Sequence, residues 1–252
     1  GALDILFEDR PNPLMRFYNE MTSLQGFDES VPWAAQFFGG AGKEHIKEYG
    51  TSVETLAKIR VKASKHASKN PFAIFNKEVS EEEVLGSPMI FDPLTRLQCC
   101  PPSCGSAAAI ICSESFAKAY NLNTDIFIAG QSMTTDYDST FSDHDMRKVV
   151  GYDMAKQAAN EVYEETGISP KDIKVCELHD CFTTNELISY EALGLADEGE
   201  AEKFVVDEQN TYGGQCVTNP SGGLLSKGHP LGATGLAQCY ELVNQLRGNA
   251  GN

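Results

Sequence analysis

The stretch CELHDCFTTNELISYEALG, Cys176–Gly194, places a histidine, an aspartate and a cysteine side by side where a strand is expected to give way to a helix. Side chains two positions apart lie on the same face of a strand, so His179 and Cys181 are predicted to point the same way. Thr183 and Glu186 have the spacing of a capping box, which predicts a helix directly after the cysteine. The amino end of that helix would favour a thiolate at Cys181.

This junction is a candidate site for proton transfer or nucleophilic attack, because open α/β sheets bind ligands at the carboxyl edge of their strands. A structural role is the alternative, since cysteine is one of the most buried residue types and a single histidine at a strand end is commonly a hydrogen-bonded core residue. The junction alone does not decide between the two roles.

A glycine-rich loop, NPSGGLLSKGHPLGATG at residues 219–235, is the second candidate. Glycines at this density let the main chain approach a ligand closely or adopt positive φ angles. The single histidine of the loop, His229, is followed by Pro230 and then by a predicted helix, and a histidine held in this way can act as a base near neutral pH. A glycine-rich turn with an incidental histidine is the alternative. The spacing matches neither a P-loop nor a dinucleotide-binding fingerprint.

Strand-like and helix-like segments alternate from about residue 88 onwards. Extended, buried segments are predicted at 95–100, 106–113, 125–133 and 173–182, and helices at 114–122, 153–167, 183–194 and 236–248. Alternation of this kind predicts an α/β fold, in which helices pack over a largely parallel or mixed sheet. Residues 1–87 contain mostly helical patterns.

The charge of the protein limits its partners. The chain has 252 residues, 41% of them hydrophobic, and a formal net charge of −16. A charge of this sign argues against nucleic acid or an anionic membrane surface as the main partner. The longest apolar run, around AAAIIC, is far too short to span a bilayer, so no transmembrane segment is predicted.

One segment is locally basic. Residues 58–69 carry Lys62, Lys65 and His66, among other basic side chains, on a predicted helix. An acidic protein that binds phosphates has to supply such a patch locally, so the cluster is a candidate phosphate site. A solvated helix face is the alternative.

Eight cysteines lie at positions 99, 100, 104, 112, 176, 181, 216 and 239. They show no repeating pattern and are predicted to be free thiols of a reducing compartment. The cluster CCPPSC lacks the paired C-x-x-C or neighbouring histidines that are typical of zinc sites, so no metal site is predicted.

The HDCF motif at 179–182, together with NPSGGLLSKGHPLGATG, resembles the thiolases, and specifically the sterol-carrier-protein type of 3-oxoacyl-CoA thiolase, a propanoyl-CoA C-acyltransferase-like enzyme. In other thiolases the first motif reads Asn-Glu-Ala-Phe. The resemblance extends over nearly the whole chain and implies an α/β thiolase fold with α-β-α-β-α layers, incomplete here. The implied parts are a mostly helical, CoA-binding loop domain at 1–87, the end of the N-terminal thiolase half at 88–120, and a truncated C-terminal half at 121–252.

The resemblance implies thiolytic cleavage of a 3-oxoacyl-CoA, with acyl transfer to coenzyme A, in the peroxisomal oxidation of fatty acids and sterol side chains. His229 would activate a nucleophilic cysteine and help to form the oxyanion site, His179 would help to hold the thioester oxygen, and Cys181 would be the acid/base thiol. Coenzyme A would be a co-substrate, with no permanently bound cofactor. The residues implied to contact it are Lys62, Lys65, His66, Cys100, Pro101 and Gly228.

The chain departs from the family pattern in three ways. None of its cysteines lies in the N-terminal context of the family's nucleophile, the last core strands are not present, and Cys104 replaces a usual aspartate. We therefore expect part of a longer, homodimeric enzyme that is inactive as a fragment, located in the peroxisome or alternatively in the cytoplasm or mitochondria. A non-catalytic, thiolase-like protein that binds acyl-CoA or serves as a scaffold is the alternative function. A related condensing enzyme is a weaker one, because those enzymes do not carry both motifs.

Overall fold

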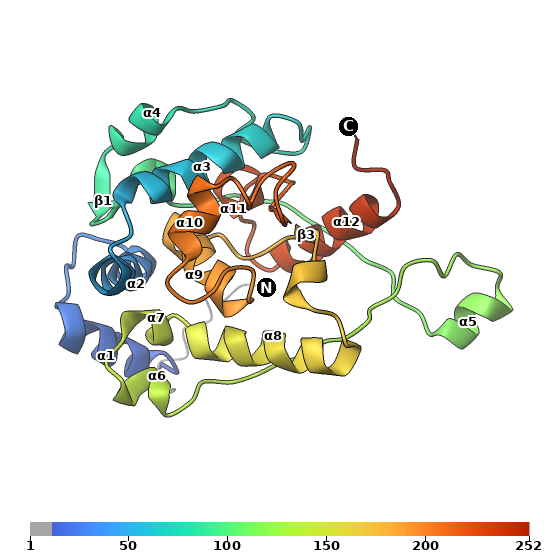
Figure 1. Cartoon of the computed structure of the whole chain (residues 1–252), viewed down its shortest axis with the longest axis horizontal. Helices are drawn as coiled ribbons and strands as arrows, with labels where there is room; N and C mark the ends of the chain where they lie inside the picture. Colours follow the sequence, from blue (N-terminus) through green and yellow to red (C-terminus); the bar gives the residue numbers. More distant parts are fainter. Residues whose placement is uncertain (1–11, 252) are drawn as a thin grey trace.

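The computed structural model describes residues 12–251, which form a mostly helical body with an arm around α5 that extends away from it (Figure 1). The helices are α1 (Met15–Gln25), α2 (Trp33–Tyr49), α3 (Val53–Ala67), α4 (Glu81–Leu85), α5 (Glu114–Ala119), α6 (Ser139–Ser142), α7 (Met146–Val149), α8 (Tyr152–Thr166), α9 (Thr183–Ala192), α10 (Ala201–Val206), α11 (Gly223–Ser226) and α12 (Thr234–Leu246), with 3₁₀ turns η1 (Arg96–Gln98) and η2 (Pro170–Asp172). None of the helices within residues 12–251 combines the length and the hydrophobicity that crossing a bilayer requires.

Regular strands are short and few among residues 12–251. β1 (Met89–Phe91) pairs with β2 (Leu94–Thr95) in an antiparallel arrangement, and β3 (Val175–Cys176) pairs with β4 (Val217–Thr218) in parallel. The α-β-α-β-α layers expected from the sequence are therefore not seen in this part of the chain. The parallel pair matters most for the site, because the HDCF motif follows β3 and the glycine-rich loop follows β4.

Two predicted strands, at 106–113 and 125–133, do not form. Both segments run without strand structure, and Ile110 and Met133 are 100% and 95% exposed. An extended segment becomes a strand only when a neighbour satisfies its backbone N–H and C=O groups. Neither segment has a pairing partner among residues 12–251, so the apolar pattern alone leaves them as exposed chain. The helix predicted between them is present as α5.

Helix α3 lies at the centre of the largest apolar cluster. Its Leu56 and Ile59 are fully buried and pack in one cluster with Leu187 and Tyr190 of α9. Residues before position 88 and residues of the last half of the chain therefore share a core. The domain boundaries predicted at 87 and 120 stay a prediction.

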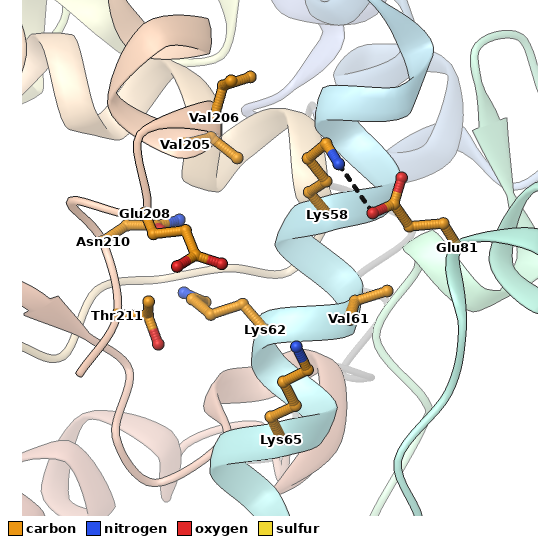
Figure 2. A pocket seen from close by; sticks show the side chains of 10 residues that line it. All are labelled: Lys58, Val61, Lys62, Lys65, Glu81, Val205, Val206, Glu208, Asn210 and Thr211. Atoms are coloured by element: carbon orange, nitrogen blue, oxygen red, sulfur yellow. Dashed lines mark hydrogen bonds and ion pairs between the residues drawn. The ribbon is translucent and has the colours of Figure 1, made fainter. Parts of the chain in front are cut away.

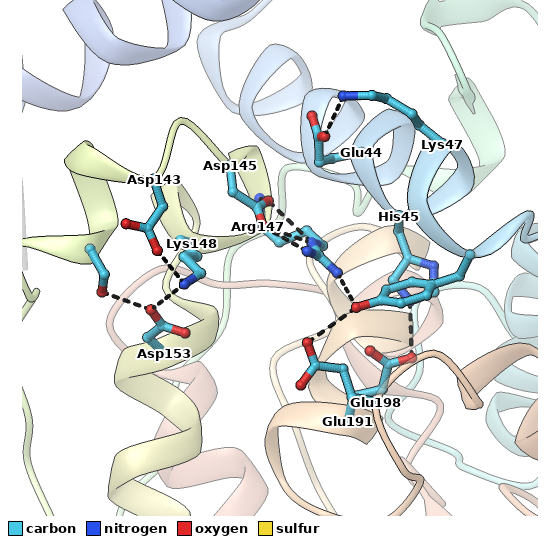
Figure 3. Close-up of polar contacts among 12 residues, drawn as sticks. Glu44, His45, Lys47, Asp143, Asp145, Arg147, Lys148, Asp153, Glu191 and Glu198 are labelled. Carbon is cyan, nitrogen blue, oxygen red and sulfur yellow. Dashed lines mark hydrogen bonds and ion pairs between the residues drawn. The ribbon is translucent and has the colours of Figure 1, made fainter.

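The end of α9 that lies away from the HDCF motif is held by a buried polar cluster. Glu191 lies 3.0 Å from Nε2 of His45 on α2 (Figure 3). Nδ1 of His45 lies 2.8 Å from the hydroxyl of Thr51. Nearby, Arg147 of α7 donates to the hydroxyl of Tyr49 at 2.7 Å. These contacts tie α2, α7 and α9 together and so fix the helix that begins directly after Cys181.

The beginning of α9 differs from the sequence-based prediction. Its N-cap is Phe182, and no side chain caps it. Glu186, the predicted capping-box partner, points into the protein, where its carboxylate pairs with Lys62 and accepts a hydrogen bond from the hydroxyl of Tyr190. The predicted capping box is therefore wrong, because a buried ammonium competes successfully for the glutamate.

Candidate active site

Two imidazoles meet at the candidate site. His179 follows β3 and His229 follows α11, and their ring centroids lie 4.9 Å apart with the ring planes at 88°. The edge-to-face arrangement is one that aromatic pairs favour. The two segments are also joined by a hydrogen bond from the N–H of Leu178 to the side-chain oxygen of Asn219, at 2.8 Å. The structure thus brings together the two histidines that the sequence singles out.

Residues 99–103 run beside both motifs. The N–H of Cys100 donates to the carbonyl of Cys181 at 2.9 Å, and the hydroxyl of Ser103 accepts from the N–H of His229 at 2.7 Å. Cys100 and Pro101, two of the predicted coenzyme A contacts, are half-buried in this segment. They lie next to the histidine pair, although they are distant from it in sequence.

The hydrogen bonds of His229 define its tautomer. Its Nδ1 lies 2.7 Å from the hydroxyl of Thr234, and that hydroxyl donates to the carbonyl of Pro230 at 3.1 Å. Because the threonine proton is used on the carbonyl, Nδ1 of His229 is assigned as the N–H donor and Nε2 is left with its lone pair. Gly228, predicted to contact coenzyme A, is buried before the histidine at φ +116°, where a side chain would be strained.

Both imidazoles are neutral at neutral pH. Partial burial lowers the pKa of His229 below its usual value. Desolvation, and then the neighbouring His229, lower the pKa of His179 to about 4. A neutral imidazole can accept a proton at one nitrogen and donate a hydrogen bond from the other. The pair can therefore combine a base with a donor toward a developing oxyanion.

Cys181 is buried, and burial raises the pKa of its thiol well above the usual value, with further increases from Cys100 and Asp180. The sequence-based expectation of a thiolate at the amino end of α9 is therefore wrong for this structure, because desolvation outweighs the hydrogen bonds from backbone N–H groups that lower the pKa. The thiol is protonated, which suits a proton donor better than a resting nucleophile. The pKa of Cys100 is likewise raised by burial, to about 11.

Two acidic residues of the same segment, Glu177 and Asp180, are not among the site residues predicted from the sequence. Asp180 accepts the N–H of Leu224 at 2.7 Å, and Glu177 accepts the N–H and the hydroxyl of Ser221 at 3.0 and 2.8 Å. Each therefore links the HDCF segment to the glycine-rich loop. The available signal was the presence of acidic residues in a segment predicted to be buried, since buried carboxylates require partners.

The sequence is similar to those of known proteins. Residues 136–252 match the family model described as "Thiolase C-terminal domain-like", a range that includes His179, Cys181 and His229. Sterol carrier protein 2 of Oryctolagus cuniculus is 53% identical over 252 residues, which is 100% of this chain and 46% of that protein. In sequence, the chain resembles thiolases. The benzoylsuccinyl-CoA thiolase subunit BbsB of Thauera aromatica is 42% identical over 205 residues, which is 81% of this chain and 52% of that subunit.

The fold of the chain resembles those of solved structures. The structure titled "Ltp2-ChsH2(DUF35) aldolase" superimposes with a TM-score of 0.72 and 26% identity, covering 86% of this chain and 56% of that one. A monomeric SCP2-thiolase like protein type 1 from Mycobacterium smegmatis superimposes with a TM-score of 0.62 and 21% identity, covering 91% of this chain and 48% of that one. The fold is thus thiolase-like, although residues 12–251 show few and short strands. The chain spans about half the length of the relatives that it matches.

The members of the basic cluster differ in their contacts, although Lys62 and Lys65 line the same pocket. Lys62 is 6% exposed, pairs with Glu186 and donates to the carbonyl of Thr218 at 3.1 Å. Lys65 is exposed and lines a pocket of about 120 Å³ between α3 and the segment after α10 (Figure 2). A contact with coenzyme A phosphates stays a prediction for Lys65, whereas Lys62 already has internal partners.

His66, the third member of the predicted phosphate cluster, is fully buried. Its Nδ1 lies 3.0 Å from the carbonyl of Asn219, and its Nε2 lies 2.8 Å from the hydroxyl of Thr211. Burial, and then the charge of Lys62, lower its pKa to about 3. A neutral, fully hydrogen-bonded imidazole offers no positive charge to a phosphate, so His66 supports the base of the glycine-rich loop instead.

Exchanging the two lysines tests their different roles. Lys62→Met removes one partner of a buried ion pair and leaves Glu186 uncompensated, so we expect the free energy of unfolding to fall by about 3–5 kcal/mol. Lys65→Met changes an exposed side chain and is expected to shift it by less than about 0.5 kcal/mol. Urea unfolding of the two variants measures the difference. Equal losses would show that Lys62 is not the internal cation described here.

The stability of the protein is expected to depend on pH through His66. The unfolded chain binds a proton at this residue below about pH 6.5, whereas the folded protein resists protonation until about pH 3. The free energy of unfolding should therefore fall as the pH decreases from 6.5, by on the order of 5 kcal/mol at the lower limit. His66→Asn should flatten this part of the curve, and His144→Asn, at an exposed histidine, should not. Thermal melts between pH 4 and 7 measure both slopes.

Proposed function

We propose that the whole protein cleaves 3-oxoacyl-CoA thiolytically and transfers the shortened acyl group to coenzyme A. The observation that carries this proposal is the edge-to-face pair of His179 and His229, with the Nε2 lone pair of His229 unused among the described contacts. The buried, protonated thiol of Cys181 lies two residues beyond His179. A base, a hydrogen-bond donor and a proton-donating thiol are three of the groups that this reaction requires, and a nucleophilic cysteine is the fourth.

In the proposed reaction, Nε2 of His229 takes the proton of a nucleophilic cysteine, and the resulting thiolate attacks the 3-keto carbon. The carbonyl oxygen becomes an oxyanion, which an N–H of the neutral His179 stabilises. Collapse breaks the bond between the 2- and 3-carbons, and the thiol of Cys181 gives its proton to the 2-carbon of the leaving acyl-CoA. The thiol of a second coenzyme A then attacks the acyl-enzyme and releases the shortened acyl-CoA. Its proton goes to the thiolate of Cys181, and the protonated His229 returns its proton to the nucleophilic cysteine as that thiolate leaves.

A pocket of about 150 Å³ adjoins His229 and supports a place for the substrate. Its walls include Phe72 and Ile74 on one side and Gly228 and Pro230 of the glycine-rich loop on the other. The apolar side chains suit the acyl or pantetheine part of a thioester. Lys65 remains the proposed contact for the phosphates of coenzyme A. By likeness to the sterol carrier proteins, we also propose a homodimer that acts in peroxisomal lipid oxidation.

The test is an assay of the full-length protein with coenzyme A and short, long and branched 3-oxoacyl-CoA, with the products identified by mass spectrometry. Formation of a chain-shortened acyl-CoA that depends on added coenzyme A supports the proposal. Binding of acyl-CoA without turnover would favour the non-catalytic alternative. A parallel assay with a 3-hydroxyacyl-CoA detects aldol cleavage, because a structural neighbour is titled an aldolase. Cleavage of that substrate alone would overturn the proposal.

A further inference from the structure

The carboxylate of Asp180 lies between the two halves of the site. Asp180 is fully buried and stands in the chain between His179 and Cys181. Its two oxygens accept the main-chain N–H groups of Leu224 and Leu225, at 2.7 and 3.4 Å. These contacts join the HDCF motif to the turn α11, which begins the last part of the glycine-rich loop.

The loop is shaped to receive this carboxylate. Gly223 has φ +60°, and a Cβ atom at this position would lie 2.0 Å from Oδ2 of Asp180. Any side chain at 223 would therefore displace either the carboxylate or the loop. The glycine is required here for a close approach as well as for its backbone angle.

The main chain between Leu224 and His229 is short, and hydrogen bonds fix its conformation. Ser226, at the end of α11, accepts a hydrogen bond on its hydroxyl from Arg60 at 2.5 Å, and its carbonyl accepts the N–H of Phe75 at 3.1 Å. Lys227 comes next, with its carbonyl accepting the N–H of Ile74 at 3.2 Å. Because these hydrogen bonds hold Ser226 and Lys227 in place, a displacement of the main chain at Leu224 is expected to displace His229 as well.

Asp180 lies in a buried environment that contains several charged groups. Arg60, fully buried, and Lys62 are the nearby cations, while Glu177 and Glu186 are the nearby anions. Burial, and then the charge of Glu186, raise the pKa of Asp180 well above its usual value, and the N–H of Leu224 and the charge of Lys62 oppose that rise only in part. A buried carboxylate that accepts two N–H groups in low dielectric is costly to move, because any motion leaves it without partners.

We propose that Asp180 is a positioning residue that sets the separation of the two imidazoles by anchoring the amino end of α11. The effect on catalysis rests on the proposed thiolase function, but the effect on geometry does not. A displacement of about 1 Å at reacting groups is enough to lower a rate about a hundredfold. Asp180 would therefore govern catalysis without touching the substrate.

The geometric effect can be measured without turnover. The five histidines of the chain are labelled and titrated by NMR in the wild type and in Asp180→Asn, with His179 assigned from a His179→Gln variant. The amide cannot accept both N–H groups, so α11 should shift and His229 should move away from His179. Because two charges near 5 Å apart repel, the pKa of His179 should then rise by roughly one unit. Gly223→Ala, which disturbs the same contact from the loop side, should produce a rise of the same sign.

Glu191→Gln is the matched control, since Glu191 is also a buried carboxylate bonded to a backbone N–H, that of Ala201 at 3.2 Å, but does not contact the loop. It should leave the pKa of His179 unchanged even where it lowers the melting temperature. In the full-length enzyme Asp180→Asn should lower kcat by roughly 10- to 100-fold, with a small change in the KM for coenzyme A.

An unchanged His179 titration in folded Asp180→Asn or in folded Gly223→Ala overturns the positioning role. If the aspartate variant does not fold, Gly223→Ala decides alone. A wild-type protein without thiolysis would overturn the proposed function and leave the titration result standing, so the two failures are distinguishable.

Discussion

Replacing His229 with alanine in the full-length protein should lower kcat for 3-oxoacyl-CoA thiolysis by about 10²- to 10⁴-fold, the range expected when a general base is lost. The reason lies in its hydrogen bonds. Thr234 holds Nδ1 as the donor, which leaves Nε2 free to take the proton of a nucleophilic thiol. The KM for coenzyme A should change much less, because the imidazole acts in the chemical step.

The pH dependence of the wild-type enzyme checks the same role. Burial lowers the pKa of His229 below its usual value of 6.5, so the neutral base persists as the pH falls to 6.5, and activity should be lost only below that point. His144→Ala is the matched control, since that imidazole is exposed and paired with Glu20 at 2.8 Å. Full activity in His229→Ala would remove the histidine from the mechanism.

The sequence was informative wherever local chemistry decides the structure. The helices after the HDCF motif and after the glycine-rich loop are present as α9 and α12. The apolar residues of α9 pack into the core, whereas Leu236, Tyr240 and Leu246 of α12 stay exposed, so helix propensity suffices there without burial of the apolar face. The strand before His179 is present only as Val175–Cys176. The pairing of strands depends on residues far away in the chain, and an alternating pattern of apolar and polar side chains does not identify the segment that will pair.

The sequence does not predict which charged side chains are buried and which are exposed. Lys62 and Lys65 are three positions apart on α3, which makes them neighbours on one helix surface, yet one is buried against Glu186 and the other is exposed. Which of them enters the core depends on where α9 packs across α3. The ion pair between Lys62 and Glu186 also explains why the capping-box prediction was wrong. Glu186 contacts a buried lysine instead of the backbone at the start of α9, so a tertiary contact outweighs the local preference.

Replacing Cys181 with alanine should also lower kcat by about 10²- to 10⁴-fold, because the proposed leaving group would lack its proton donor. Cys181→Ser is expected to retain more activity than alanine, since a hydroxyl can donate a proton in the same direction. Cys216→Ala is the matched control, as Cys216 is fully buried in the core cluster around α3 and has no proposed contact with substrate. Steady-state assays of the three full-length variants compare the two positions.

The rate of alkylation distinguishes a protonated thiol at Cys181 from a thiolate. Because burial raises the pKa of Cys181 well above its usual value, iodoacetamide at pH 7.5 should modify it more slowly than the exposed Cys104, Cys112 and Cys239. Peptide mapping over time gives the order of modification. If Cys181 reacts as fast as the exposed thiols in folded protein, the helix terminus outweighs desolvation and the residue is better suited to nucleophilic attack than to proton donation. Slow alkylation combined with a large loss in Cys181→Ala would instead assign the thiol to proton transfer, since a group that is rarely ionised can still give its proton to a strongly basic carbon.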